Sequence, residues 1–229
     1  MTTVVSNIAA PKKSELRERT RRRLLHVARG AFARKGHVGT ILKDDILVPA
    51  RVSVGSFYHQ FRDKTDLFLA ILREHSETFR GMVREAHRRR ELEGPYELAR
   101  HSYETVFRLA EENEDLFRIM ARERESDDSR VRQYLREDHR LWVESLADDY
   151  CRLAGADIAS DGRAQLAAEL VISLTLGALL TYLDQPTLDR HRMRERLISG
   201  LVHFTIAGVA GLVGQSAAAP RASDPVAKE

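Results

Sequence analysis

Residues 52–68 read VSVGSFYHQFRDKTDLF. Within this stretch Phe57 and Phe61 stand four residues apart, so a helix over residues 54–61 would turn both rings to the same side. Ser53 immediately precedes that helix, and a serine hydroxyl in this position accepts the hydrogen bond of an early backbone N–H. Asp63 can cap a following helix in the same way. The stretch therefore predicts two capped helices joined by a tight turn.

The residues before this stretch predict two more helices. From residue 15 to residue 35 the apolar positions, such as Leu24 and Phe32, recur on one helical face. Gly36 then ends the helix, because glycine readily takes the left-handed conformation that follows a last helical turn. A shorter helix is expected over residues 43–50. This spacing of helices suits a helix-turn-helix, in which the second helix enters the major groove of DNA and reaches base edges with its first residues.

Residues 20–72 resemble the N-terminal domain of the TetR family of transcriptional regulators. The family pattern Val-Ser-x-Gly-(Thr/Ser)-(Leu/Phe)-Tyr-x-x-Phe, followed by x-(Ser/Asp)-Lys-x-x-Leu, matches the run from Val52 to Leu67. Upstream, TRRRLL at 20–25 and AFARKG at 31–36 are similar to the first helix of the family. The resemblance implies an all-α protein with an N-terminal three-helix helix-turn-helix DNA-binding domain. A C-terminal helical bundle would then bind a ligand and form the homodimer.

The helix-turn-helix geometry assigns expected roles to individual side chains. Val54 and Ser56 would project toward base edges, and Gly55 would allow close approach of the backbone. The family pattern implies that Tyr58 and Lys64 contact phosphates. For His59, a surface position without any DNA contact is the alternative. The residues expected at the DNA are Thr40, Lys43, Arg51, Ser53, Val54, Gly55, Ser56, Tyr58, His59 and Lys64.

The resemblance breaks in the turn of the motif. Arg51 stands where the family usually has glycine, and a left-handed conformation costs a residue other than glycine about 1 kcal/mol. Arg51 must therefore avoid that conformation or be compensated. Pro49 removes one hydrogen bond from the short second helix and disfavours helical geometry at Val48. The segment between Gly36 and Val52 is also one residue longer than is usual for the family, which leaves the geometry of the second helix open.

Charge is distributed unevenly along the 229 residues. Residues 1–64 contain 14 lysines and arginines against 5 aspartates and glutamates, a formal charge of +9. The rest of the chain contains 23 basic and 29 acidic residues, a formal charge of −6. A basic front on an acidic body indicates that one end meets a polyanion such as double-stranded DNA, although a solvated basic helix face is the alternative.

Helical patterns also account for the remainder of the chain. They predict a flexible arm over residues 1–14, a DNA-binding domain over 15–64, an effector-binding and dimerisation domain over 65–214, and a disordered tail over 215–229. Beyond the helix that ends near residue 90, helices are expected over 95–111, 115–124, 128–154, 162–183 and 187–212, with a loop at 155–161.

The last two helices are apolar nearly all round, so they are expected to be buried on more than one side. The resemblance implies that they pair with the same helices of a second subunit, although a purely intramolecular core is the alternative. The dimer candidates are Ala178, Leu179, Ile198, Leu201, Ala207 and Gly208.

Aromatic and other large apolar residues on the inner helices are candidates for an effector pocket, with core packing as the alternative for each. They are Phe107, Phe117, Met120, Tyr134, Trp142 and Leu174. Arg118, Arg122 or His139 would be available for a polar head group. The ligand is expected to be largely apolar.

Several classes of protein find no support in the sequence. The single cysteine, Cys151, rules out an intramolecular disulfide framework and fits a reducing, cytoplasmic location. The sequence contains no His-x-x-x-His pair, no phosphate-binding Gly-Lys-Ser/Thr motif and no Gly-x-Ser-x-Gly motif, so neither an enzyme, a metal site nor a cofactor is predicted. No membrane span is expected. The remaining alternative is a helical small-molecule-binding or scaffold protein that no longer reads DNA.

Overall fold

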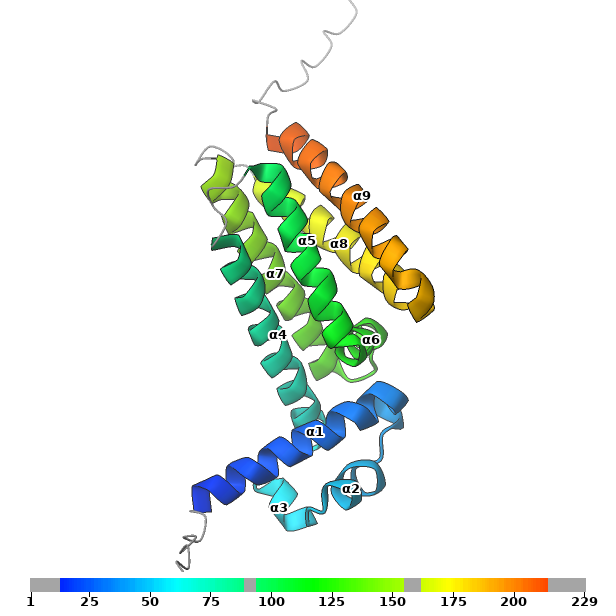
Figure 1. The fold of residues 1–229 in the computed structure, drawn as a ribbon. Coiled ribbons are helices and arrows are strands. Elements are labelled where there is room, and N and C mark those ends of the chain that lie inside the picture. The colour runs from blue at the N-terminus through cyan, green and yellow to red at the C-terminus, as the bar shows by residue number, and fades with distance from the viewer. Residues whose placement is uncertain (1–12, 89–93, 155–161, 214–229) are drawn as a thin grey trace, which may run out of the picture. The chain divides into compact units, whose positions relative to one another are not determined.

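The computed structural model describes residues 13–88, 94–154 and 162–213, and every regular element in these ranges is a helix (Figure 1). The all-α prediction is confirmed. The predicted tail and the loop at 155–161 lie outside the described residues, as does the predicted arm up to residue 12. The elements are α1 Lys13–Gly39, η1 Leu42–Leu47, α2 Val48–Ala50, α3 Val54–Tyr58, α4 Lys64–Arg88, α5 Pro95–Glu112, α6 Glu114–Glu123, α7 Ser129–Ala154, α8 Arg163–Leu183 and α9 Thr187–Val213.

The helices form two compact units. The first, which we call the head, comprises Met1–Phe79 and Asn113–Arg136, and the second, the body, comprises Arg80–Glu112 and Glu137–Glu229. The head thus contains the helix-turn-helix together with α6 and the beginning of α7. Arg29 on α1 donates two hydrogen bonds of 2.6 Å to the carboxylate of Asp115 on α6. Such a bidentate ion pair fixes both the distance and the orientation of the two helices.

The regular part of α1 ends where the sequence predicts. Gly36 has a φ of 72° and a ψ of 175°, a region that only glycine occupies without strain, and the helix continues for one irregular turn to Gly39. A Cβ at Gly36 would lie 3.1 Å from Oε1 of Glu123 on α6. Gly36 therefore serves both the turn and the close approach of α6.

The extra residue between α1 and α3 is taken up by a change of helix type. Residues Leu42–Leu47 form a π-helix, in which the N–H of Val48 donates to the carbonyl of Lys43, five residues earlier. A π-turn holds one residue more than an α-turn, so it absorbs a single insertion without moving the ends of the segment. Pro49 follows in the first turn of α2, a position in which proline is tolerated. The predicted single helix over 43–50 is thus two short elements.

Arg51 does adopt the left-handed conformation, with φ 51° and ψ 48°. Its N–H donates to the carbonyl of Val48, and the N–H of Val52 donates to the carbonyl of Leu47, both at 3.0 Å. This pair of bonds is the Schellman motif, which the burial of Val52 and Leu47 in one core completes. These bonds provide the compensation that an arginine in this turn requires.

The predicted packing of the recognition helix is confirmed. Phe57 and Phe61 are buried, with ring centroids 5.8 Å apart, and they join Leu24 and Phe32 of α1 in the core of the head. The hydroxyl of Ser53 accepts the N–H of Ser56 at 3.2 Å and so caps α3. Helix α3 ends at Tyr58, earlier than predicted, because the chain turns there to bring Phe61 back against Phe57.

In the body, α9 packs against both α5 and α8, which lie beside it in Figure 1. The buried hydroxyl of Tyr103 on α5 is hydrogen-bonded to Thr205 on α9, and that of Tyr182 on α8 donates to Glu111 on α5. By length and composition α8 could cross a membrane, since it has 21 residues and contains a strongly apolar window of 18 residues. Only 28% of that apolar window is buried within the chain, so α8 is covered far less than its sequence predicts.

Candidate DNA interface

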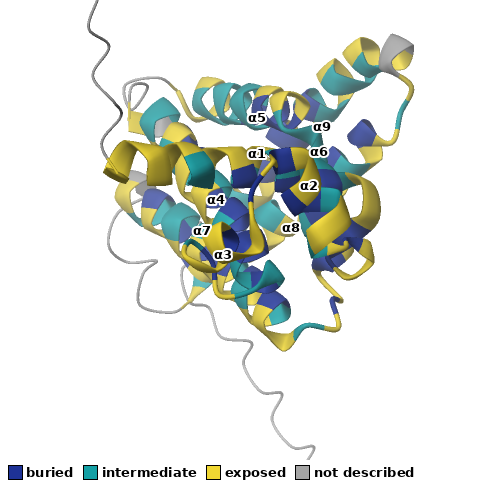
Figure 2. Ribbon diagram, turned by 90° about the horizontal axis from the view of Figure 1, so that it is seen from below, coloured by how far each residue is buried: buried dark blue, intermediate teal, exposed yellow. Residues whose placement is uncertain are grey.

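The outer surface of α3 carries most of the side chains expected at the DNA. Val54 and Tyr58 are 54% and 57% exposed although both are large and apolar. Gly55, Ser56 and His59 are exposed as well (Figure 2). The opposite side of the helix is held by Phe57, which is fully buried. Helix α3 is therefore anchored from behind and presents its free surface to solvent, as a helix entering a groove requires.

The first turns of α1 add positive charge to the same unit. The side-chain amide of Gln60 donates to the carbonyl of Arg17 at 3.1 Å, and the guanidinium of Arg21 lies 4.8 Å from the ring centre of Phe61. The exposed guanidinium of Arg23 donates to the carbonyl of Arg51 at 3.5 Å. These contacts dock the basic start of α1 beside α3. The arginines on it were not predicted as DNA contacts, although the run RERTRRR at 17–23 signals them.

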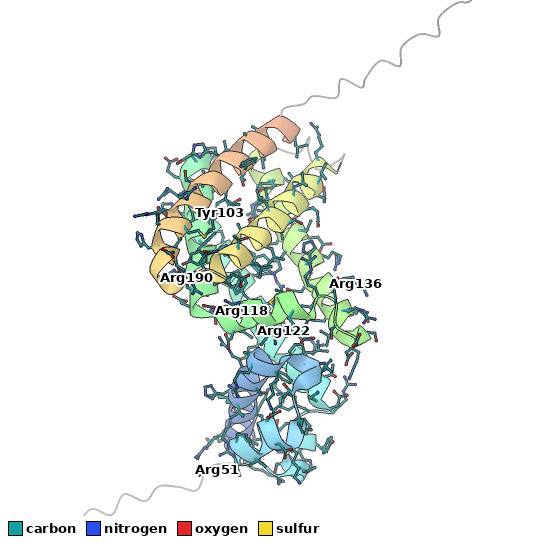
Figure 3. The ribbon with its side chains drawn as sticks, turned by 90° about the vertical axis from the view of Figure 1, so that its right-hand side faces the viewer. Arg51, Tyr103, Arg118, Arg122, Arg136 and Arg190 are labelled. Carbon is teal, nitrogen blue, oxygen red and sulfur yellow. The ribbon has the colours of Figure 1, made fainter. Side chains whose placement is uncertain are left out.

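Among the remaining candidates, Lys43 and Arg51 are exposed, and Figure 3 shows Arg51 at the surface of the head. One other expected contact is corrected by the structure, and a second, that of Lys64, stays a prediction. Thr40 is 2% exposed, and its hydroxyl donates to the carbonyl of Gly36, so this side chain does not face a phosphate. The ammonium of Lys64 donates to the carbonyls of His37 and Thr40, each at 2.7 Å. Its first role is therefore to close the end of α1.

A buried polar cluster surrounds that closure. The N–H of His37 donates to Glu123 at 2.8 Å, and Nε2 of His37 lies 3.0 Å from the hydroxyl of Thr65, which in turn donates to Asp128. Burial lowers the pKa of the His37 imidazole, and the charge of Lys64 lowers it further. Burial also lowers the pKa of the Lys64 ammonium, although the charge of Glu123 opposes this. The cluster joins the end of α1 to α4, to α6 and to the residue that precedes α7, all within the head.

The residues expected to line an effector pocket are divided between the two units. Phe117, Met120 and Tyr134 belong to the head, where Phe117 packs edge-on against Phe79 with centroids 5.3 Å apart. Phe107 and Trp142 belong to the body, where Phe107 is fully buried against Tyr182. The sixth candidate, Leu174, also belongs to the body. Neither unit by itself therefore contains all six of the residues predicted to line the pocket.

Leu174, the sixth candidate, is 45% exposed, so it does not line the interior of the chain as predicted. It belongs instead to an exposed apolar face of α8. In that face Leu166, Leu170, Leu174 and Ala178 follow one another at intervals of four residues, the spacing of one helical side.

The predicted dimer residues are divided between the buried core of the chain and its surface. Leu179, Ile198 and Leu201 are buried within the single chain, so they are corrected to intramolecular core. Ala207 and Gly208 are exposed, and Ala178 is half-buried. Phe204 on α9 was not predicted, yet it is 73% exposed. We call the apolar positions that reach the surface of the two helices the apolar face. Its members, exposed except for the half-buried Ala178, are Leu166, Leu170, Leu174, Ala178, Phe204, Ala207 and Gly208.

Comparison with known proteins places this geometry in context. Residues 24–71 match the model of the family described as "Bacterial regulatory proteins, tetR family". The solved structure of GusR from Salmonella enterica is 25% identical with a TM-score of 0.63, and the match covers 86% of this chain and 96% of that one. A structure described as a TetR-family transcriptional regulator from Syntrophomonas wolfei is 18% identical with a TM-score of 0.66, covering 88% and 99%. FadR from Bacillus subtilis, solved in complex with stearoyl-CoA, is 16% identical with a TM-score of 0.64, covering 82% and 98%.

Proposed function

Because the chain is a transcriptional regulator of the TetR family, we propose that it is a homodimeric repressor whose two α3 helices bind a palindromic operator. A largely apolar small molecule bound by the helices that follow the helix-turn-helix would release it. The observation that carries the proposal is the surface of α3, where Val54 and Tyr58 remain exposed on a helix anchored by Phe57.

The apolar face supports the homodimer. Leu170 and Phe204 are 54% and 73% exposed in the single chain, and both are large apolar side chains. Exposed apolar patches of this kind mark surfaces that another molecule covers. TetR-family regulators act as dimers in the cytoplasm. We therefore interpret the apolarity of α8 as a subunit interface rather than a membrane span.

The two residues that suggested a scaffold protein unable to read DNA are both accommodated in the helix-turn-helix. They are Pro49 and Arg51, whose types are unusual in a helix-turn-helix. Pro49 lies in the first turn of α2, and the left-handed Arg51 is held by the two bonds of the Schellman motif. Neither residue disturbs the buried contacts of α3, because Phe57 and Phe61 keep their places in the core.

DNA selected from a random pool, tested by mobility shift, should contain a pseudo-palindrome whose half-sites lie about one helical turn apart. Tyr58→Ala should weaken binding to all selected sequences, by about tenfold per half-site, because it removes a contact to a charged phosphate. Tyr96→Ala, which truncates an exposed tyrosine of the body, is the matched control and should bind as the unmodified protein does. Equal binding by both variants would contradict the assignment of Tyr58.

The effector can be followed through Trp142, the single tryptophan of the chain. It lies on α7 with the guanidinium of Arg80 over its ring, 5.9 Å from the ring centre. An apolar effector bound along α7 should quench or shift its fluorescence, and should raise the free energy of unfolding by about 2.7 kcal/mol at a hundred times its dissociation constant. Release of DNA should follow the same concentration range.

Stearoyl-CoA and acetyl-CoA form a useful pair of first probes, within a panel that also includes steroid-like and aromatic compounds. The two thioesters differ only in the acyl group. A response to stearoyl-CoA alone would therefore show that the protein recognises the long acyl group. A compound that releases DNA without a change at Trp142 would place the effector away from α7. A compound that stabilises the protein but leaves the DNA bound would contradict the proposed release.

A further inference from the structure

The exposed side of α3 lacks the side chains that usually read bases through hydrogen bonds. Guanine is most often read by arginine or lysine, and adenine by asparagine or glutamine. None of these types occurs between Val54 and Tyr58. Gln60, shortly beyond the helix, already donates its side-chain amide to the carbonyl of Arg17. The base-reading surface of α3 is therefore made of other groups.

The two residues after Val54 contribute little recognition of their own. The hydroxyl of Ser53 donates to that of Ser56 at 2.9 Å, so Ser56 takes part in the hydrogen bonds of the helix cap. Gly55 has no side chain, and a Cβ added there would meet nothing within 4 Å. The open space in front of Gly55 lets the edge of a base pair approach the backbone closely.

Val54 stands at the border of that space, with its isopropyl group 54% exposed. In the major groove, the C5 methyl of thymine is the apolar group on the edges of the four natural base pairs, and apolar side chains read it by contact. We infer that Val54 recognises a thymine in each half-site by packing against this methyl. The inference rests on the proposed function, since it assumes that α3 enters the groove.

Recognition of this methyl group also predicts how the protein responds to methylated cytosine in the operator. Cytosine methylated at C5 presents a methyl group at the same place in the groove as thymine does. Recognition by packing alone does not distinguish the two bases at that carbon. The contact of Val54 therefore favours 5-methylcytosine, as well as thymine, over unmodified cytosine and uracil, which both lack the methyl.

The test replaces each thymine of the selected half-site in turn by uracil, which removes the methyl and keeps every hydrogen-bonding group. At one position the affinity should fall about fourfold per half-site, the effect of exposing one buried methyl-sized group, and about fifteenfold when both half-sites are changed. Val54→Ala should bind the thymine and uracil operators equally well, because the partner of the methyl has gone. Cytosine at this position should bind weakly, and 5-methylcytosine should recover part of the loss.

Val48→Ala is the matched control, since Val48 is an exposed valine of the same unit on α2. This variant should keep the full preference for thymine. Uracil that is neutral at every position of the unmodified protein's operator would overturn the inference, as would a preference that persists in Val54→Ala. Either result would leave the proposed function intact, because the operator is still bound. Failure to select any DNA sequence would instead remove both proposals.

Discussion

Leu170→Glu is expected to convert the protein into a monomer and to weaken operator binding by about a hundredfold or more. Leu170 lies at the centre of the α8 side formed by Leu166, Leu170 and Leu174, and it is more than half exposed in the single chain. In a symmetric dimer the substitution places a carboxylate in the interface from each subunit. An uncompensated buried charge costs about 3–5 kcal/mol, and the substitution also removes the packing of the leucine. A monomer then holds a single half-site.

Sedimentation velocity measures the first effect and mobility shift measures the second. Leu141→Glu is the matched control, because Leu141 is an exposed leucine on α7, outside the apolar face. It should remain dimeric and bind DNA normally. Circular dichroism should give both variants the helical content of the unmodified protein, since both side chains are exposed. A Leu170→Glu protein that stays dimeric at micromolar concentration would show that another surface forms the dimer.

Two substitutions at positions of positive φ should change the free energy of unfolding in opposite directions. Gly36→Ala should lower the free energy of unfolding by about 1–3 kcal/mol, because φ 72° and ψ 175° lie in a region almost restricted to glycine. The new Cβ would also lie 3.1 Å from the Glu123 carboxylate that accepts the N–H of His37. Arg51→Gly should raise the free energy of unfolding by about 1 kcal/mol, because glycine occupies the left-handed region without strain.

Urea denaturation measures both changes. Gly81→Ala is the control for a glycine in an ordinary helix, since a Cβ there meets nothing within 4 Å, and it should stabilise α4 by about 0.5–1 kcal/mol. If Arg51 also contacts a phosphate, Arg51→Gly should reduce the slope of log affinity against log salt by about one unit. A Gly36→Ala protein as stable as Gly81→Ala would show that the turn can rearrange around Gly36.

The parts of the head that could be predicted depend on neighbours in sequence. The cap at Ser53, the end of the regular helix at Gly36 and the inward faces of Phe57 and Phe61 all follow from residues within four positions of one another. The prediction that Thr40 faces a phosphate is wrong because its hydroxyl binds the carbonyl of Gly36. The hydrogen bond from Lys64 to the carbonyl of Thr40 was missed for the same reason, since a sequence pattern does not show where a main-chain acceptor is left open. The sequence likewise showed only that the segment between Gly36 and Val52 has one residue more than is usual, and not that this segment contains a π-helical turn.

The C-terminal helices were harder because they are apolar on several sides. Composition predicts that such helices are buried, but it does not divide their residues between the core of the chain and its surface. Leu179, Ile198 and Leu201 turned out to be core, whereas Leu174 and Phe204 are exposed. The recurrence of apolar residues every four positions from Leu166 to Ala178 does mark one side of α8. It does not show whether that side faces the core or the surface, because the two apolar sides of α8 differ only in their angle around the helix axis.

Because the head is formed by two separate segments of the chain, a recombination event between two related genes can separate residues that pack together. Arg29 on α1 is paired with Asp115, and the N–H of His37 with Glu123, so two segments more than 80 residues apart in the chain complete one compact unit. A crossover just after the helix-turn-helix would join an α1 to an α6 of different ancestry and break both pairs at once. An exchange of the remaining helices keeps both pairs intact only if α6 stays with the helix-turn-helix. The smallest exchangeable module is therefore discontinuous in the sequence.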